Sequence, residues 1–350
     1  MESTPIITKE TKRRLVVDYE GKLSFKERWA RRLKTSHTWA KLALAICRFI
    51  LMLGVSYVIV YPFLSRIANS FMTVEDIIDT TVVFIPKNFT TEIYQAIFVD
   101  NHYMEALFNT LLLSLLCAVL QTFIAAMIGY GIAKFKFKGN KLLTAFVVIT
   151  MVIPHSALEF SLLRHFNSFD IFQVISWTDK GLIGLLFGGP VKMLGTYWPW
   201  VVLSLGGLAF KNGLYIYMMR QFFKGVPDEL EESAYVDGSG VFRTFFQIIL
   251  PLSVPMMITI FLFSFAWQWT DGFYTELFYT NVENARLMLQ VIEIPKSLEQ
   301  NLQAGFGAAT LYSSVVRNTA GLMVIAPLLI MYLFCQRYLV QGIERSGLVG

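Results

Sequence analysis

The chain has 350 residues, of which 55% are hydrophobic, 15% aromatic and only 16% charged, and its formal net charge is +5. This composition excludes an ordinary soluble domain, and the lack of a short repeating unit excludes a solenoid. Several apolar runs approach or exceed the ~20 residues that a helix needs to cross a bilayer. We therefore predict an all-α integral membrane protein with about six transmembrane helices, and no nucleic-acid partner, because the positive charge follows membrane sidedness.

The N-terminal extension, residues 1–41, is rich in Lys and Arg, which places it on the cytoplasmic side. Ser24 and Glu27 have the spacing of a capping box, and Trp29 follows among basic residues. This pattern predicts a basic amphipathic helix over about 22–38 that lies on the inner membrane surface. An ordinary solvated tail fits the same residues equally well.

The transmembrane domain, residues 42–340, is predicted from six apolar runs. Pro154 falls inside the third run, where we expect a kink. Segments 67–100, 164–195 and 275–310 are expected to be outer loops, and the tail 341–350 is expected to be cytoplasmic, like the N-terminus. The predicted spans are about 42–65, 105–132, 142–163, 196–219, 252–274 and 315–338.

A polar segment, residues 220–250, separates two of these spans. Pro227 and Asp228 suit the first turn of a helix, and the acidic residues that follow favour a helix N-terminus. Gly238 and Gly240 then allow a sharp turn or a close approach of another backbone. From these residues alone, a plain connector at the membrane surface is an equally open interpretation.

The spacing of residues within this segment matches a known sequence pattern. It matches the pattern E-x-A-x-x-x-G-x9-I-x-L-P, with Asp237 before the glycine, and it resembles the EAA loop of the membrane subunits of bacterial ABC importers. The approach from Arg220 and the end of the chain, 336–350, look like sugar permeases of the maltose-transporter type. The likeness covers about 42–350, but the long N-terminal extension and the expanded stretch 164–195 depart from it. The pattern residues are Glu232, Ala234, Gly238, Ile248, Leu250 and Pro251.

The resemblance implies the type I permease fold of ABC importers in a bacterial cytoplasmic membrane. It also implies four kinds of partner besides membrane lipid: a second homologous permease, two ATPase subunits, an extracytoplasmic solute-binding protein and a carbohydrate substrate. The segment at about 227–238 would be the coupling helix that docks into an ATPase, with Glu231 added to the pattern residues as part of the docking site. ATP and Mg²⁺ would be bound by the partner ATPases, and no cofactor is expected in this chain.

Polar residues inside predicted spans suggest a substrate pathway, because burying them in lipid is costly. Lys211 and Asn212 lie about 12 Å inside the fourth span, counted at 1.5 Å per residue from its end. Trp267, Gln268 and Asp271 near the end of the fifth span could stack on sugar rings and bind hydroxyl groups. A helix break or a snorkelling lysine, and an aromatic belt at the outer interface, explain the same residues without a pathway.

The sequence contains no motif of an enzyme. A phosphate-binding G-x-x-x-x-G-K-[ST] loop, an H-E-x-x-H motif and a Cys/His cluster are all lacking. We therefore expect a transporter subunit and no catalysis in this chain. An ion-coupled secondary transporter and a membrane assembly subunit that transports nothing remain as alternatives, and the sequence does not identify the sugar.

Overall fold

The computed structural model describes residues 36–170, 183, 189–279, 286–303 and 306–347. This part of the chain is helical, with two isolated β-bridges and no longer strand, in agreement with the predicted all-α class. The predicted amphipathic helix at 22–38 lies almost entirely outside the described residues, as do residues 171–182 and 184–188 of the expanded stretch 164–195. The chain divides into two units, residues 1–65 and 66–350, and most of helix α2 belongs to the first.

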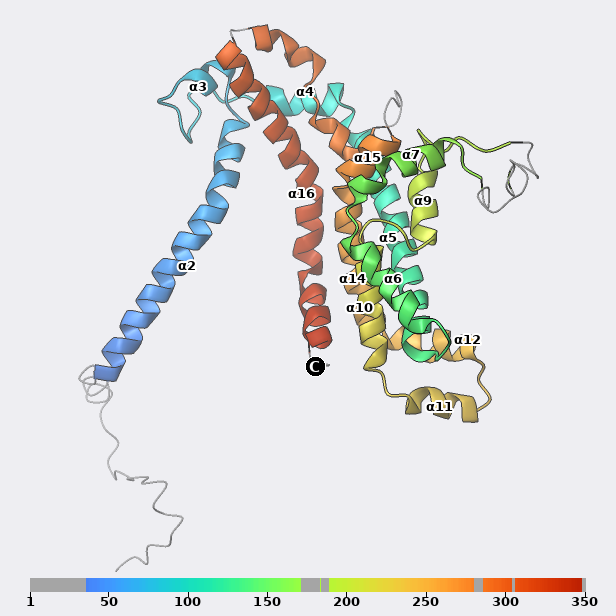
Figure 1. Cartoon of the computed structure of the whole chain (residues 1–350). Coiled ribbons are helices and arrows are strands. Elements are labelled where there is room, and N and C mark those ends of the chain that lie inside the picture. Colours follow the sequence, from blue (N-terminus) through green and yellow to red (C-terminus); the bar gives the residue numbers. More distant parts are fainter. Residues whose placement is uncertain (1–35, 171–182, 184–188, 280–285, 304–305, 348–350) are drawn as a thin grey trace, which may run out of the picture. The chain divides into compact units, whose positions relative to one another are not determined.

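Helices account for nearly all of the described structure (Figure 1). Their bounds are α2 Ser36–Asn69, α3 Val74–Ile78, α4 Glu92–Asp100, α5 Tyr103–Lys134, α6 Asn140–Val152, η2 His155–Leu158, α7 Glu159–Asn167, α9 Trp198–Leu205, α10 Asn212–Lys224, α11 Glu229–Val236, α12 Val241–Thr244, η3 Phe245–Ile249, α13 Leu250–Leu252, α14 Val254–Trp269, α15 Gly272–Phe278, η4 Met288–Ile292, η5 Lys296–Gln303 and α16 Phe306–Gly347.

Three of these helices are long and apolar enough to cross a membrane: Ala40–Asn69, Tyr103–Lys134 and Ala309–Tyr338. Two bent helix pairs raise the number to five within the described residues if each pair is one span. The prediction of about six spans needs a correction at the fourth. Residues 196–219 form two helices, α9 and α10, and the chain between them leaves the helical path at 206–211.

The third predicted span breaks where proline was expected to kink it. Asn140–Val152 and His155–Asn167 are bent by 101° relative to each other. Pro154 has no N–H to donate, and it disfavours helical geometry at the residue before it. Ile153 accordingly has extended backbone, with φ −65° and ψ 121°. The expected kink is thus a full break.

Helix α5 lies at the centre of the second unit and packs closely on α10. The ideal Cβ position on Gly129 of α5 would lie 2.6 Å from the Cβ of Met219 and 3.0 Å from the backbone nitrogen of Arg220. Only a glycine lets the two helix backbones approach this closely, as is typical of helix packing in membranes. Around this contact, Ala125, Ala126, Tyr215, Met219 and Phe223 form part of a buried apolar cluster.

Buried polar side chains join α5 to α9 and α14, and α14 to α16. Gln121 donates to the hydroxyl of Ser204 on α9 at 3.3 Å and accepts from the hydroxyl of Ser264 on α14 at 2.6 Å. Trp269 at the end of α14 donates to the Val324 carbonyl of α16 at 3.0 Å. Such hydrogen bonds satisfy polar groups that lipid cannot, so they favour one arrangement of the helices.

Two of the predicted outer loops contain short helices that pack together at the end of the second unit opposite α11 (Figure 1). Asn101, just after α4, donates to the carbonyls of Val291 at 2.8 Å and Glu293 at 2.7 Å. Asp100 accepts from the backbone N–H of Ser297 at 2.9 Å, and hydrogen bonding with the side chain and the backbone of Ser297 lowers the pKa of its carboxyl. The described residues of the loops 67–100 and 275–310 therefore form one structured layer.

Candidate functional site

The polar segment contains the short helix α11, which agrees closely with the predicted helix at 227–238. After its last residue the chain closes with two hydrogen bonds, from Gly238 N–H to the Tyr235 carbonyl at 3.0 Å and from Ser239 N–H to the Ala234 carbonyl at 2.9 Å. This is the Schellman arrangement, in which the glycine adopts left-handed backbone. Gly238 has φ +81°, so the glycine of the motif forms the turn that ends α11.

The two faces of α11 differ in their exposure to solvent. Glu231 and Ala234 are buried against the rest of the chain, whereas Glu232, Asp237 and Gly238 are exposed. Large apolar side chains accompany the exposed acidic ones: Val236 is 87% exposed and Phe242, on α12, is 74% exposed. An exposed surface that mixes apolar and acidic side chains is typical of an interaction site. We name Glu232, Val236, Asp237, Gly238 and Phe242 the α11 surface.

Lys134, the last residue of α5, holds α11 in place. Its ammonium group donates to the Val226 carbonyl at 2.6 Å and to the Asp228 carboxylate at 2.5 Å, and it lies 3.6 Å from Glu231 Oε1. The Lys134 side chain is only 6% exposed. Lys134 was not singled out from the sequence. The cluster of acids that opens α11 was the signal for a basic partner, but no spacing indicated which lysine would meet it.

The carboxyl groups of Asp228 and Glu231, both beside Lys134, have pKa values shifted in opposite directions. The hydrogen bond from Lys134 lowers the pKa of Asp228, so the stabilisation from this pair is present at neutral pH and is lost as the pH falls through the lowered value. Burial raises the pKa of Glu231, and Lys134 opposes that rise. Removal of the lysine would thus leave a buried carboxyl group without its cation.

The remaining motif residues lie behind the α11 surface. Ile248 and Leu250 are partly buried against the apolar cluster of α5 and α10, while Pro251 is exposed within α13. Ile248 belongs to η3, a turn of π-helix, and the chain then bends by 75° between Leu252 and Val254. The second half of the motif, Ile248 to Pro251, therefore anchors the polar segment against the apolar cluster and changes the direction of the chain. It contributes little to the α11 surface.

Gly238→Ala is expected to destabilise the turn after α11 by about 1–2 kcal/mol, because a Cβ is strained in left-handed backbone. Gly240→Ala is the matched control, since Gly240 has φ −78° and its Cβ would meet no atom within 4 Å. In hydrogen-exchange mass spectrometry, the peptide over 229–239 should exchange about tenfold faster in the first variant. Equal exchange in the two variants would contradict this assignment of Gly238.

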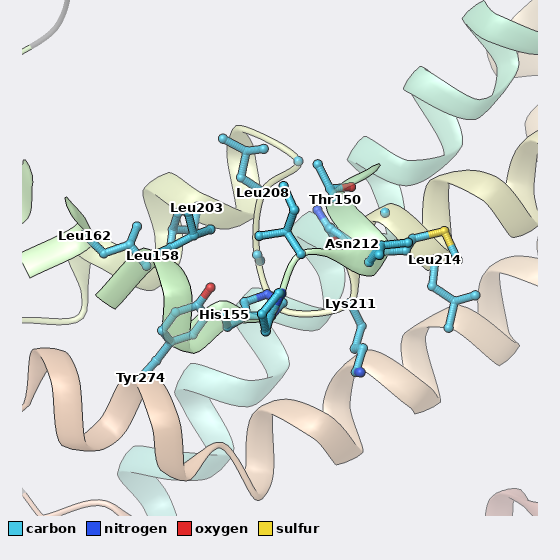
Figure 2. Close-up of a pocket in the computed structure, with 17 residues that line it drawn as sticks. Thr150, His155, Leu158, Leu162, Leu203, Leu208, Lys211, Asn212, Leu214 and Tyr274 are labelled. Carbon is cyan, nitrogen blue, oxygen red and sulfur yellow. The ribbon is translucent and has the colours of Figure 1, made fainter. Parts of the chain in front are cut away.

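A cavity of about 350 Å³ lies where the helical path breaks between α9 and α10 (Figure 2). Lys211 and Asn212 line it together with the segment Thr150–His155 at the break after α6 and with Tyr274 of α15. Lys211 has left-handed backbone with φ 65°, which is uncommon for a residue with a Cβ. Asn212 is fully buried, and its amide nitrogen and oxygen have no hydrogen-bond partner among the described residues.

The three predicted pathway residues of α14 and its end have different environments. Trp267 is 46% exposed and lies 5.0 Å from the Lys211 ammonium, measured to its ring. Gln268 is partly buried on the same helix. Asp271 is buried, accepts from Trp200 Nε1 at 3.0 Å and from the Tyr274 N–H at 3.0 Å, and thereby caps α15. The structure thus brings Lys211 and Trp267 together, while Asp271 is engaged in holding α9 and α15.

Within the described residues, no group of three or more His, Cys, Asp and Glu side chains is placed to hold a metal ion. The two features that stand out are therefore the α11 surface and the cavity at Lys211, and neither resembles a catalytic centre. The exposed apolar residues Val236 and Phe242 and the ring of Phe210, 4.9 Å from the Lys211 ammonium, were not singled out from the sequence. Hydrophobic residues in an apolar chain give no signal of this kind until their exposure is known.

Comparison with known proteins identifies relatives over most of the chain. The family described as "Binding-protein-dependent transport system inner membrane component" matches residues 121–345. The polygalacturonan/rhamnogalacturonan transport system permease protein YtcP of Bacillus subtilis (strain 168) is 24% identical over 299 residues, which cover 84% of this chain and 93% of that protein. The maltodextrin transport system permease protein MdxG of the same strain is 24% identical over 314 residues, which cover 89% of this chain and 98% of that protein.

A solved structure has a similar fold. A chain of a bacterial alginate ABC transporter, crystallised in complex with an alginate pentasaccharide-bound periplasmic protein, matches with a TM-score of 0.56 at 17% identity. The match covers 86% of this chain and 98% of that one. At this identity the likeness concerns the fold alone.

Proposed function

Because the chain belongs to the family of binding-protein-dependent transport system inner membrane components, we propose that it is the permease subunit of an ATP-driven importer of carbohydrates. As a member of this family it is a membrane transport subunit and not an enzyme. The observation that carries the rest of the proposal is the α11 surface, which presents the motif residues Glu232, Asp237 and Gly238 to solvent at one end of the bundle.

The α11 surface is proposed to dock on an ATPase subunit. Glu232 would form an ion pair with the partner, and the exposed side chains of Val236 and Phe242 would enter an apolar recess. Gly238 has no neighbouring atom within 4 Å of its ideal Cβ position, so the partner's backbone could approach it closely. Lys134 would then transmit movement of α11 to α5, and through α5 to the helices packed around it.

The remaining partners follow from the same function. Two ATPase subunits would bind and hydrolyse ATP with Mg²⁺, a second related permease would complete the pathway, and an extracytoplasmic binding protein would deliver the sugar. ATPase closure would turn the two permeases between inward-facing and outward-facing states. Both termini and the α11 surface would lie on the cytoplasmic side, with the layer formed by 67–100 and 275–310 outside.

Carbohydrate is the substrate class supported by the named relatives, one of which is named for the transport of maltodextrin and another for the transport of polygalacturonan and rhamnogalacturonan. In this chain the pathway would pass Lys211, Asn212, Trp267 and Gln268: Lys211 and Asn212 line the cavity, and the Trp267 ring lies 5.0 Å from the Lys211 ammonium. Aromatic faces stack on the C–H surfaces of sugars, and amide groups bind hydroxyl groups.

Charge reversal on the α11 surface tests the docking proposal. When the membrane subunits are co-purified with their ATPase, Glu232→Lys should reduce the bound ATPase at least about tenfold, as loss of a charged contact with repulsion predicts. Glu92→Lys makes the same charge change at an exposed residue of α4, in the layer far from α11, and should leave association unchanged. Undiminished association of Glu232→Lys would reject α11 as the docking site.

Transport itself is tested with the complete transporter in proteoliposomes. Uptake of a radiolabelled saccharide should require both internal ATP and the binding protein. Uptake that continues without ATP but collapses on addition of an ionophore would instead favour an ion-coupled transporter, and so would overturn the proposed function.

A further inference from the structure

The cavity between α9 and α10 has the backbone geometry and the volume of a binding site. The chain from Gly206 to Lys211 is irregular, and irregular backbone at membrane depth is tolerated where it lines a cavity or is covered by protein. Broken helices of this kind are where transporters bind their substrates. The cavity's volume of about 350 Å³ lies at the small end of the range for ligand pockets, ~300–1,000 Å³, and suits a single sugar unit.

Lys211 contributes a positive charge that the described part of the chain does not neutralise. Its ammonium group lies 4.9 Å from the ring of Phe210 and 5.0 Å from that of Trp267, and none of the described carboxylates is within 4.0 Å of it. Figure 2 shows its side chain extending away from the loop that carries it. Aromatic faces hold a cation in place without cancelling its charge, so this ammonium remains able to bind an anion.

Asn212 contributes neutral polar groups beside that charge. It is completely buried and lines the cavity, yet neither its amide nitrogen nor its amide oxygen has a partner within the described residues. A buried side chain that is left unsatisfied in this way is costly and calls for an explanation such as a ligand. Its amide can donate to one hydroxyl group and accept from another, as vicinal sugar hydroxyls require.

The aromatic rings around Lys211 provide an apolar surface. Phe210 lies 5.5 Å from Trp267 and 4.5 Å from His155, measured between ring centroids, and Trp267 is 46% exposed. A sugar ring placed against Trp267 could therefore bring a carboxylate to Lys211. A neutral saccharide would use the rings and the amide but would leave the ammonium group without a partner.

We propose that Lys211, Asn212 and Trp267 form a subsite for the carboxylated sugar unit of an acidic saccharide, with the carboxylate on Lys211 and the sugar ring on Trp267. The inference rests on the proposed function and adds to it the charge of the substrate. No covalent step is involved. The backbone of Lys211 contributes to selectivity, because its left-handed conformation fixes the direction of the side chain.

The test compares two probes of equal length that differ in their carboxylates, α-1,4-linked trigalacturonate and galactotriose. Binding to the purified transporter is measured by quenching of tryptophan fluorescence. The wild type should bind trigalacturonate more tightly, and Lys211→Asn should weaken that binding at least about tenfold, as expected for one charge-assisted hydrogen bond, without changing galactotriose binding. Asparagine tolerates left-handed backbone, so this variant removes the charge with little strain.

Three further variants make the outcome specific. Lys211→Arg should keep the preference for trigalacturonate, Asn212→Leu should weaken binding of both probes, and Lys141→Asn, at an exposed lysine beyond α5, should change neither. Equal binding of both probes by the wild type, or equal effects of Lys211→Asn on both, would overturn the acidic subsite. If ATP-dependent uptake of a saccharide persists in that case, the proposed function stands; if no saccharide of either kind is taken up, the proposed function itself fails.

Discussion

Replacing Gly129 by leucine is expected to lower the stability of the protein by about 3 kcal/mol or more, the largest packing effect of any single substitution considered. The new side chain would start 2.6 Å from the Cβ of Met219 and 3.0 Å from the backbone nitrogen of Arg220. Because the obstacle includes the backbone of α10, rotamer changes cannot relieve it, and α5 and α10 must separate. The apparent melting temperature of the purified protein should fall by roughly 5–10 °C.

Gly131→Leu provides the matched control on the same helix. Its Cβ would meet no atom within 4 Å, and leucine favours helix more than glycine does. This variant should therefore be as stable as the wild type or slightly more stable, as judged by the same melting curve in the same detergent. Similar losses in both variants would show that α5 and α10 do not approach each other at Gly129.

Replacing Lys134 by methionine is expected to release α11 from α5. The change removes the donor to the Val226 carbonyl and leaves the Glu231 carboxylate buried without its cation, at a cost of about 3–5 kcal/mol. Hydrogen exchange of the peptide over 226–236 should rise strongly, and ATP-driven uptake should fall because movement of α11 no longer reaches α5. ATP hydrolysis by the assembled transporter should continue without matching transport.

Two variants separate this local effect from a general loss of folding. Lys136→Met removes an exposed lysine only two residues away and should change neither exchange nor uptake. Adding Glu231→Gln to Lys134→Met removes the stranded charge and should restore part of the stability, but not the link through Asp228. Normal coupling of hydrolysis to uptake in Lys134→Met would show that α11 moves α5 by another route.

The cavity at Lys211 illustrates why only part of the site was predictable. The sequence marked Lys211 and Asn212 because polar residues are rare in apolar spans, and it marked Trp267 because aromatic rings suit sugars. Nothing in the spacing predicted that Trp267 and Lys211, 56 positions apart, would lie 5.0 Å from each other. Asp271 was predicted to share their role, yet its carboxylate is engaged by Trp200 and the N–H of Tyr274, contacts that depend on the fold.

By itself, the sequence determined the membrane class, the first, second and last apolar helices, the interruption of the third span near Pro154 and the position of α11. Hydrophobic length, proline chemistry and the motif's spacing act locally along the chain. Tertiary structure alone decided that the fourth span is two helices around a cavity, and which motif residues face outward. The tertiary structure also decided that Lys134 is the residue that holds α11 in place. Each of these depends on which residues distant in sequence come into contact, and local propensities do not encode that choice.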